Sequence, residues 1–195
     1  MINFNDCIIL ENNMSNLKET SIDKRDSSNI KYMTSSECKA INFDNVKNDY
    51  IKDLNLSVIP KSNDALFINK NNQLVFVEFK NGFMDNEKKF AIRKKIYDSI
   101  IILTDILNVG ISKLRDNMEY ILVYNENVNV NEQEVQKKNQ YIQSSKSYNS
   151  FAKSLGKLAN DEYVCFGVNI FKNYCFKDVH TYTENEFEEY LQNYT

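Results

Sequence analysis

Two acidic residues and a lysine stand at positions where they could act together on a phosphate group. Glu78 and Lys80 end the segment LVFVEFK (residues 74–80), which otherwise has the apolar composition of a buried strand. Burying either charge alone costs free energy, and a buried pair breaks even only when it is well hydrogen-bonded. Asp64 opens a second apolar run, DALFI (residues 64–68). These three residues are therefore the first candidates for chemistry.

The strand that carries Glu78 and Lys80 should lie in the middle of a sheet. Alternate side chains of a strand point to opposite faces, so Glu78 and Lys80 share one face. That face also carries Leu74 and Phe76, and the opposite face carries Val75, Val77 and Phe79. Because both faces are apolar, the pattern predicts a central strand that is buried on both sides.

A hairpin would bring Asp64 to Glu78. The turn-forming segment NKNNQ (residues 69–73) separates the two apolar runs, and Asn71 is its middle residue. Folding the chain about Asn71 places Leu66 opposite Phe76 and Asp64 opposite Glu78. Side chains in such a cross-strand pair are about 4.5–5.5 Å apart at Cβ. We therefore expect the two carboxylates to be neighbours.

Two carboxylates in this arrangement repel each other, and a hard cation would remove the conflict. Mg²⁺ prefers oxygen ligands and is commonly held by one or two carboxylates with water and phosphate; Mn²⁺ is the alternative ion. Such a site could present a water to a phosphodiester, and Lys80 could orient that water or stabilise charge in the transition state. The alternative interpretation is an ion-pair network that fixes the strand register without catalysis.

Asp64, followed after a hairpin by Glu78-Phe79-Lys80 and then a helix, resembles the PD-(D/E)xK nuclease superfamily, which includes the restriction endonucleases. The resemblance covers residues from about 35 to 125 and implies a restriction-endonuclease-like αβββαβ core. It assigns Asp64 and Glu78 to metal ligation and Lys80 to catalysis. The residue between acid and lysine, Phe79, would offer its backbone carbonyl to the metal.

Two features qualify the match. Asn63 precedes Asp64 at a position where the superfamily pattern has proline, and Pro60 lies nearby. Members of the superfamily often carry an additional acid on the preceding helix, and Glu37 is the candidate for that ligand in this chain.

The resemblance implies a metal-dependent phosphodiesterase that hydrolyses DNA in preference to RNA through a metal-activated water. It also implies a role in restriction or phage defence, and a homodimer, since such enzymes often dimerise to cut two strands. An alternative is a non-catalytic module of the same fold that binds nucleic acid or a partner protein. A third interpretation is a protein that interacts only with other proteins.

A basic cluster follows the hairpin, in a predicted amphipathic helix from Asp85 to about Leu107 with Phe90 and Tyr97 on its apolar side. These cations could follow a nucleic-acid backbone, although a solvated helix face is an equally good explanation. The residues of the cluster are Lys88, Lys89, Arg93, Lys94 and Lys95.

The remaining pattern predicts an α/β fold with a central mixed β-sheet flanked by helices, in a single domain over 1–195 with a C-terminal elaboration at 131–195. Thr183 and Glu186 should form a capping box at the start of the last helix. Expected strands cover 8–10, 120–124, 163–171 and 175–182; expected helices cover about 35–56, 131–158 and 183–194.

Composition limits the partners. The formal net charge is −3, so nucleic acid would be contacted through a local patch and not over the whole surface. The four cysteines form no CxxC pair, and no signal peptide or membrane-spanning stretch is evident, which together predict a cytoplasmic protein without a membrane partner. Neither a P-loop nor a G-x-G-x-x-G motif is present, so no nucleotide cofactor is expected.

Overall fold

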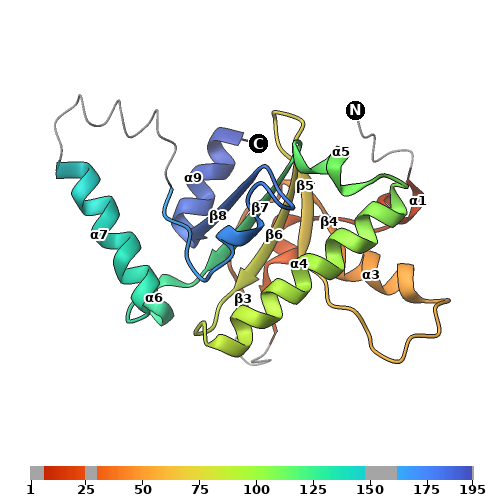
Figure 1. Cartoon of the computed structure of the whole chain (residues 1–195), viewed down its shortest axis with the longest axis horizontal. Helices are drawn as coiled ribbons and strands as arrows, with labels where there is room; N and C mark the ends of the chain where they lie inside the picture. The colour runs from red at the N-terminus through yellow and green to blue at the C-terminus, as the bar shows by residue number, and fades with distance from the viewer. Residues whose placement is uncertain (1–6, 25–29, 148–161, 195) are drawn as a thin grey trace.

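The centre of the fold is a six-stranded mixed sheet with helices against both faces, which confirms the predicted α/β class (Figure 1). The computed structural model describes residues 7–24, 30–147 and 162–194. The strand order is β1-β4-β5-β6-β7-β8: neighbouring strands from β1 to β6 are antiparallel, and the β6–β7 and β7–β8 pairs are parallel. The strands are β1 (Met14–Asn16), β4 (Lys39–Asn42), β5 (Ala65–Ile68), β6 (Leu74–Lys80), β7 (Met118–Tyr124) and β8 (Asp178–Thr183).

The helices divide between the two faces of the sheet. Helices α3 (Phe43–Ile51) and α4 (Asn86–Ile106) contribute to one apolar core, and α9 (Glu184–Tyr194) packs through Phe187 and Leu191 against the other face. Figure 1 shows the long helix α4 running diagonally across one face of the sheet. The other helical segments are α1 (Ile8–Glu11), α2 (Leu17–Thr20), α5 (Ile111–Arg115), α6 (Glu126–Asn129), α7 (Gln133–Ser147) and η2 (Asn169–Phe171). No helix among the described residues has the length and apolarity needed to cross a membrane.

Strand β6 is buried on both faces, as its sequence predicts. Phe76 belongs to the core under α4, whereas Val77 belongs to the core under α9. The hairpin register is also as predicted, because Leu66 pairs with Phe76 and Ala65 with Val77. Asn72 has a left-handed φ of 59° in the connecting turn, a conformation that asparagine tolerates better than most residues.

The prediction of a helix over about 35–56 is wrong in its first part, where residues 35–38 have no regular secondary structure and residues 39–42 form strand β4. Asn42 ends that strand and caps α3 by accepting a hydrogen bond from the backbone N–H of Asn45, at 3.1 Å. The four-residue periodicity is real only for Val46 and Tyr50, which pack on the core, while Leu54 lies 47% exposed in the following loop. Pairing with β1 and β5 therefore outweighs the local helical pattern in residues 39–42.

Further expectations about the elements need correction. Residues 8–10 form helix α1, not a strand, and residues 163–171 form turns and η2, with left-handed φ angles at Phe166 and Gly167. The strand expected over 175–182 is β8, which begins at Asp178.

Phe90 is 70% exposed on α4 and not on its buried side, and Tyr97 is 44% exposed. The helix predicted to about residue 158 is α7; residues 148–161 lie outside the described part of the chain.

The start of α9 confirms the predicted capping box. Thr183 Oγ1 accepts from the Glu186 backbone N–H at 3.2 Å, and Glu186 Oε2 accepts from the Thr183 N–H at 2.8 Å. The same Glu186 carboxylate receives a 2.6 Å bond from the ammonium of Lys138, a nearly buried residue of α7. Lys138 also donates to the carbonyl of Thr181, so one side chain ties α7 to β8 and α9.

Candidate active site around Asp64 and Glu78

The segment that leads into β5 is fastened to one face of α4. The backbone N–H of Lys61 donates to Asp98 Oδ2 at 2.7 Å, and the N–H of Asn63 donates to Ser99 Oγ at 2.8 Å. Asp98 and Ser99 lie one helical turn beyond Lys95, on the face of α4 that meets the sheet. The position of Asp64 is therefore set by the helix as well as by the hairpin.

A second contact holds the same segment to α3. Ser62 donates a 2.5 Å hydrogen bond to Asp44 Oδ1, and Asp44 lies in the first turn of α3. Because neighbouring residues are held by two different helices, the chain around Asp64 has little freedom to move relative to β6.

Both oxygens of Asp64 are engaged. Oδ2 accepts a 2.7 Å bond from the backbone N–H of Phe79, and Oδ1 lies 3.0 Å from the ammonium of Lys95. The backbone N–H of Asp64 donates to the carbonyl of Val77 at 3.1 Å. The hairpin ladder thus ends in a contact between the Asp64 side chain and the backbone of β6.

Glu78 is the buried member of the pair, with 0% of its surface exposed. The Lys95 ammonium lies 2.7 Å from Oε1 and 2.9 Å from Oε2 of Glu78, and the ammonium of Lys80 forms an ion pair with Oε1. Lys95 therefore contacts both carboxylates, and Lys80 contacts one of them. A single cation between two acids is the arrangement that the sequence predicts for a metal, but here the cation is a lysine from α4.

The electrostatics of this cluster follow from burial and from the two negative charges. Burial raises the pKa of Glu78, and the charge of Asp64 adds to this, while Lys95 and Lys80 act in the opposite direction. Burial alone would lower the pKa of Lys95, but the charges of Glu78 and Asp64 outweigh it and hold that pKa well above its ordinary value. Lys95 is therefore an ammonium at every physiological pH.

The interior behind Glu78 also contains polar groups. The pKa of Tyr120 is raised well above its ordinary value by burial and then by the charges of Glu78 and Asp64, so its hydroxyl stays protonated. That hydroxyl and both polar side-chain atoms of Asn63 are buried without a hydrogen-bond partner among the described residues. Ordered water is the usual partner for such groups.

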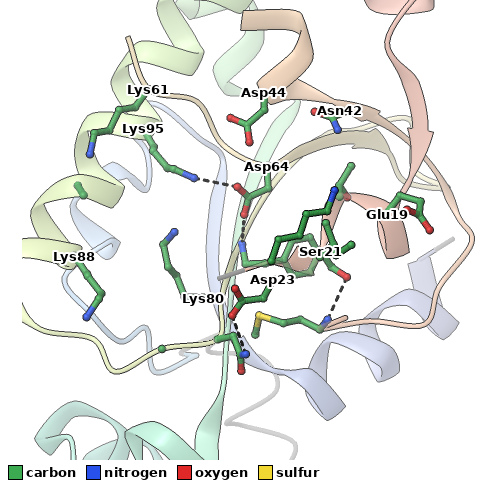
Figure 2. Close-up of a pocket in the computed structure, with 18 of the residues that line it drawn as sticks. Glu19, Ser21, Asp23, Asn42, Asp44, Lys61, Asp64, Lys80, Lys88 and Lys95 are labelled. Atoms are coloured by element: carbon green, nitrogen blue, oxygen red, sulfur yellow. Dashed lines mark hydrogen bonds and ion pairs between the residues drawn. The ribbon is translucent and has the colours of Figure 1, made fainter. Parts of the chain in front are cut away.

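A cavity of about 570 Å³ is lined by Asp64, whereas the fully buried Glu78 is not among its lining residues. Its walls come from an N-terminal segment (residues 19–24 and Met33), α3, the end of β6 and α4. Figure 2 shows Lys80, Lys88 and Lys95 on one side of it and Glu19, Ser21 and Asp23 on the other. Asp23 fastens the N-terminal wall to the end of β6, since Asn81 Nδ2 donates to its Oδ2 at 2.9 Å. The charged residues that line the cavity are Glu19, Asp23, Lys24, Asp44, Lys61, Asp64, Lys80, Lys88 and Lys95.

The structure divides the predicted basic cluster. Lys88 and Lys95 line the cavity, and Lys88 also pairs with Asp85 at 2.5 Å. Lys89 pairs with Glu132 and Glu134 on the side of α7, and Lys94 pairs with Asp98. The guanidinium of Arg93 packs against Gly167, where a Cβ atom would come within 2.5 Å of it. These five residues therefore do not share one surface.

The other candidate residues are also placed. Phe79 lines the cavity next to Lys80 and is 7% exposed. Glu37 is exposed in the segment before β4 and is not among the residues that line the cavity. Glu19, from α2, is an acid that does line it. No local pattern marks Glu19, Asp44 or Lys61 in the sequence, because each reaches the cavity only through the tertiary fold.

The donor set fits an ion that keeps much of its own water. Asp64 and Glu78 offer carboxylate oxygens, which Mg²⁺ and Mn²⁺ prefer. Within residues 7–24, 30–147 and 162–194, no group of three or more His, Cys, Asp or Glu side chains could hold a metal ion. An ion held here would therefore rely on two carboxylates together with water or phosphate, a pattern that Mg²⁺ commonly adopts.

Comparison with known proteins gives no match for this chain among protein-family models, curated proteins or solved structures.

Proposed function

We propose that the protein is a metal-dependent nuclease of the restriction-endonuclease-like fold that hydrolyses DNA in preference to RNA. One observation carries the proposal: the carboxylates of Asp64 and Glu78 contact the same cation, the Lys95 ammonium, at 3.0 and 2.7 Å. Two acids that converge on one cation beside a cavity with several lysines form a place where a divalent ion and a phosphate could be held together.

The chain order supports this fold. Strands β4, β5 and β6 are antiparallel and are followed by helix α4, the short helix α5 and the parallel strand β7, with α3 inserted between β4 and β5. The four-residue helix α2 precedes β4 and is separated from it by the short strands β2 (Ile22–Asp23) and β3 (Lys31–Tyr32). The order of the main elements is consistent with the αβββαβ core that the resemblance implies. Asp64 precedes the second of those strands, and Glu78 and Lys80 end the third.

In the proposed reaction, Asp64 and Glu78 would hold Mg²⁺ or Mn²⁺, and the backbone carbonyl of Phe79 would be the additional ligand that the resemblance implies. The bound ion would supply Lewis-acid activation of water and neutralise charge on the phosphodiester. Phe79 fixes the direction of the Asp64 carboxylate through its N–H, and burial fixes that of Glu78. Lys80, at the cavity wall beside Glu78, would stabilise negative charge that develops on the phosphate.

The cavity lysines give the substrate a binding surface. Lys61 and Lys88 would contact phosphates that flank the scissile bond, an electrostatic contribution that does not depend on base sequence. A cytoplasmic location, a homodimer that cuts both strands, and a role in restriction or phage defence belong to the same proposal and derive from the resemblance.

A second candidate function is a non-catalytic module of the same fold that binds nucleic acid. It is favoured by the contacts of Lys80 and Lys95, which together balance the charges of both acids from within the chain. In that case the acids would only fix the strand register, and the cavity lysines would bind phosphate without a metal.

The test is cleavage of linear DNA, circular DNA and RNA by the full chain with Mg²⁺ or Mn²⁺, and with EDTA. Asp64→Asn, Glu78→Gln and Lys80→Met should each lower the cleavage rate on the order of 10²-fold or more, since each removes a group that acts on the reacting centre. Glu189→Gln, on the outer side of α9, and Lys113→Met, on α5, are matched controls that remove an exposed charge.

Circular dichroism and urea unfolding would establish that each variant is folded before its rate is compared. Cleavage that persists in EDTA, or in the folded Asp64→Asn variant, would contradict the proposal. Binding of DNA at equal affinity with and without metal, in the absence of any cleavage, would favour the second candidate.

A further inference from the structure

Lys95 is the residue of the site whose role the sequence does not reveal. It lies in the middle of α4 between Ile92 and Ile96, which are both fully buried. Its own side chain is 18% exposed and lines the cavity. The helix therefore carries the stem of Lys95 along the core and brings the ammonium out at the point where the two acids meet.

The contacts of Lys95 differ in kind from those of Lys80. Lys95 Nζ lies within 3.0 Å of Asp64 Oδ1 and of both carboxylate oxygens of Glu78. Lys80 forms an ion pair with Glu78 and offsets the charge of that acid. Among the described residues, Lys95 is the cation that contacts both acids and so bridges them.

A divalent ion bound to the same two carboxylates would need the space that this ammonium fills. Mg²⁺ binds carboxylate oxygens at about 2.0–2.1 Å, which is inside the 2.7–3.0 Å shell of the Lys95 ammonium. Two cations cannot occupy one point between the same oxygens, since they would also repel each other. A metal that binds the oxygens facing Lys95 would therefore compete with the present position of its ammonium.

We propose that Lys95 is an exchangeable internal counter-ion: its ammonium holds Asp64 and Glu78 together in the metal-free protein and leaves when a divalent ion binds. The cavity beside it gives the released side chain a place to go, and an ammonium there would face the phosphate of the substrate. The inference rests on the proposed function, because it assigns the metal to the same two acids. Lys95 is a positioning residue in this proposal.

Competition between Lys95 and the metal has a measurable consequence. The natural chain must break its own ion pairs to bind the ion, so its affinity for metal is lower than the acids alone would give. Removing the ammonium should raise that affinity. It should also lower the thermal stability of the metal-free protein, because two neighbouring carboxylates then lose the cation that they share.

The closing experiment measures Mn²⁺ binding to the full chain by isothermal titration calorimetry and by electron paramagnetic resonance, without substrate. Lys95→Met, which keeps the length and the apolar stem, should bind Mn²⁺ at least tenfold more tightly than the natural chain. Lys113→Met, the same change at an exposed residue of α5, should bind as the natural chain does. In thermal melts, Mn²⁺ should raise the Tm of Lys95→Met more than that of the natural chain.

A second measurement uses the unmodified protein and so does not depend on the folding of a variant. Acetylation by acetic anhydride, followed residue by residue with mass spectrometry, reports whether an amine is engaged. Labelling of Lys95 should be low without metal and should rise when Mn²⁺ or Mg²⁺ saturates the protein, while labelling of Lys113 stays constant. Labelling of Lys95 that stays the same or falls on metal saturation would overturn the inference.

The outcomes separate this inference from the proposed function. Equal Mn²⁺ affinity in the natural chain and in Lys95→Met overturns the counter-ion role and leaves the nuclease proposal standing. Binding by Lys95→Met alone supports the counter-ion role and contradicts a metal-dependent activity of the natural chain. Binding by neither protein overturns both proposals.

Discussion

The backbone N–H of Phe79 donates a 2.7 Å hydrogen bond to Oδ2 of Asp64. Phe79, which lies between Glu78 and Lys80 in β6, therefore orients the carboxylate of Asp64. One oxygen of Asp64 is thereby committed to the backbone of β6, and the other is left to face a cation. The sheet backbone therefore restricts the orientation of the Asp64 side chain, although Asp64 lies just before β5.

This bond predicts different consequences for two substitutions of Asp64. Asparagine keeps an oxygen that can accept from Phe79, whereas alanine leaves that N–H without its charged acceptor. We expect Asp64→Ala to lose about 0.5–1.5 kcal/mol more unfolding free energy than Asp64→Asn, the usual contribution of a hydrogen bond between neutral groups. Urea denaturation checks this, and equal stability of the two variants would contradict it.

Glu78 and Lys95 should show strong coupling in a double-mutant cycle. Glu78→Gln leaves a largely buried ammonium without its main partner, which typically costs about 3–5 kcal/mol of stability. Adding Lys95→Met removes the surplus positive charge that Lys80 and Lys95 together leave beside Asp64, so the double variant should be more stable than Glu78→Gln alone. Simple additivity of the two single effects would show that the ions are not coupled in the folded protein.

The raised pKa of Lys95 predicts an alkaline loss of stability. The charges of Glu78 and Asp64 hold that pKa above the ordinary value of 10.5, so the folded chain retains the proton more tightly than the unfolded chain. The resulting stabilisation is complete below pH 10.5 and is lost as the pH rises from there through the pKa of the folded state.

We therefore expect the unfolding free energy to fall less steeply in Lys95→Met than in the natural chain as the pH rises above the ordinary pKa of lysine. Burial also raises the pKa of Tyr120 and Tyr124, so these groups contribute to the fall in both proteins. The difference between the two curves isolates Lys95. Parallel curves would mean that the ammonium gains nothing from the acids.

The divided basic cluster predicts which lysines bind nucleic acid. Lys61→Gln and Lys88→Gln, at the cavity, should weaken DNA binding and each reduce the slope of log affinity against log salt by about 0.9. Lys89→Gln should leave that slope unchanged and instead lower the stability, because Lys89 pairs with Glu132 and Glu134. Fluorescence anisotropy over a salt series measures the slopes. A slope change in Lys89→Gln would contradict the assignment.

The capping box of α9 predicts a graded series in the C-terminal region. Thr183→Ala should cost about 1 kcal/mol as the loss of an N-cap. Glu186→Ala should cost more, because Glu186 caps the Thr183 N–H and also neutralises Lys138, which is 3% exposed. Glu189→Ala, at an exposed position of the same helix, should change the unfolding free energy by no more than about 0.5 kcal/mol.

The sequence predicts the part of the site that depends on local rules. Alternation of apolar residues identifies β6 as central, and the turn chemistry around Asn71 fixes the register that brings Asp64 toward Glu78. Both signals are short in range, since they concern residues that are neighbours along the strand or across one hairpin.

Lys95 is different, because its role depends on how α4 lies across the sheet. The sequence places it in a run of cations on one helix, where it is indistinguishable from Lys94, yet the two point to different partners. Strand β4 was missed for a related reason: its four residues are stabilised by pairing with β1 and β5, and that information lies elsewhere in the chain.

The turn between β5 and β6 lies at the far end of these strands from Asp64 and Lys80. Four residue steps of about 3.3 Å along β5 separate it from Asp64 by roughly 13 Å. Asn69 holds the turn internally, through bonds from the N–H groups of Asn71 and Gln73 to its side-chain oxygen at 3.0 Å each. The exposed side chain of Asn71 therefore offers a position for a fluorophore or a surface anchor, attached through Asn71→Cys, that would leave the cavity open to solution.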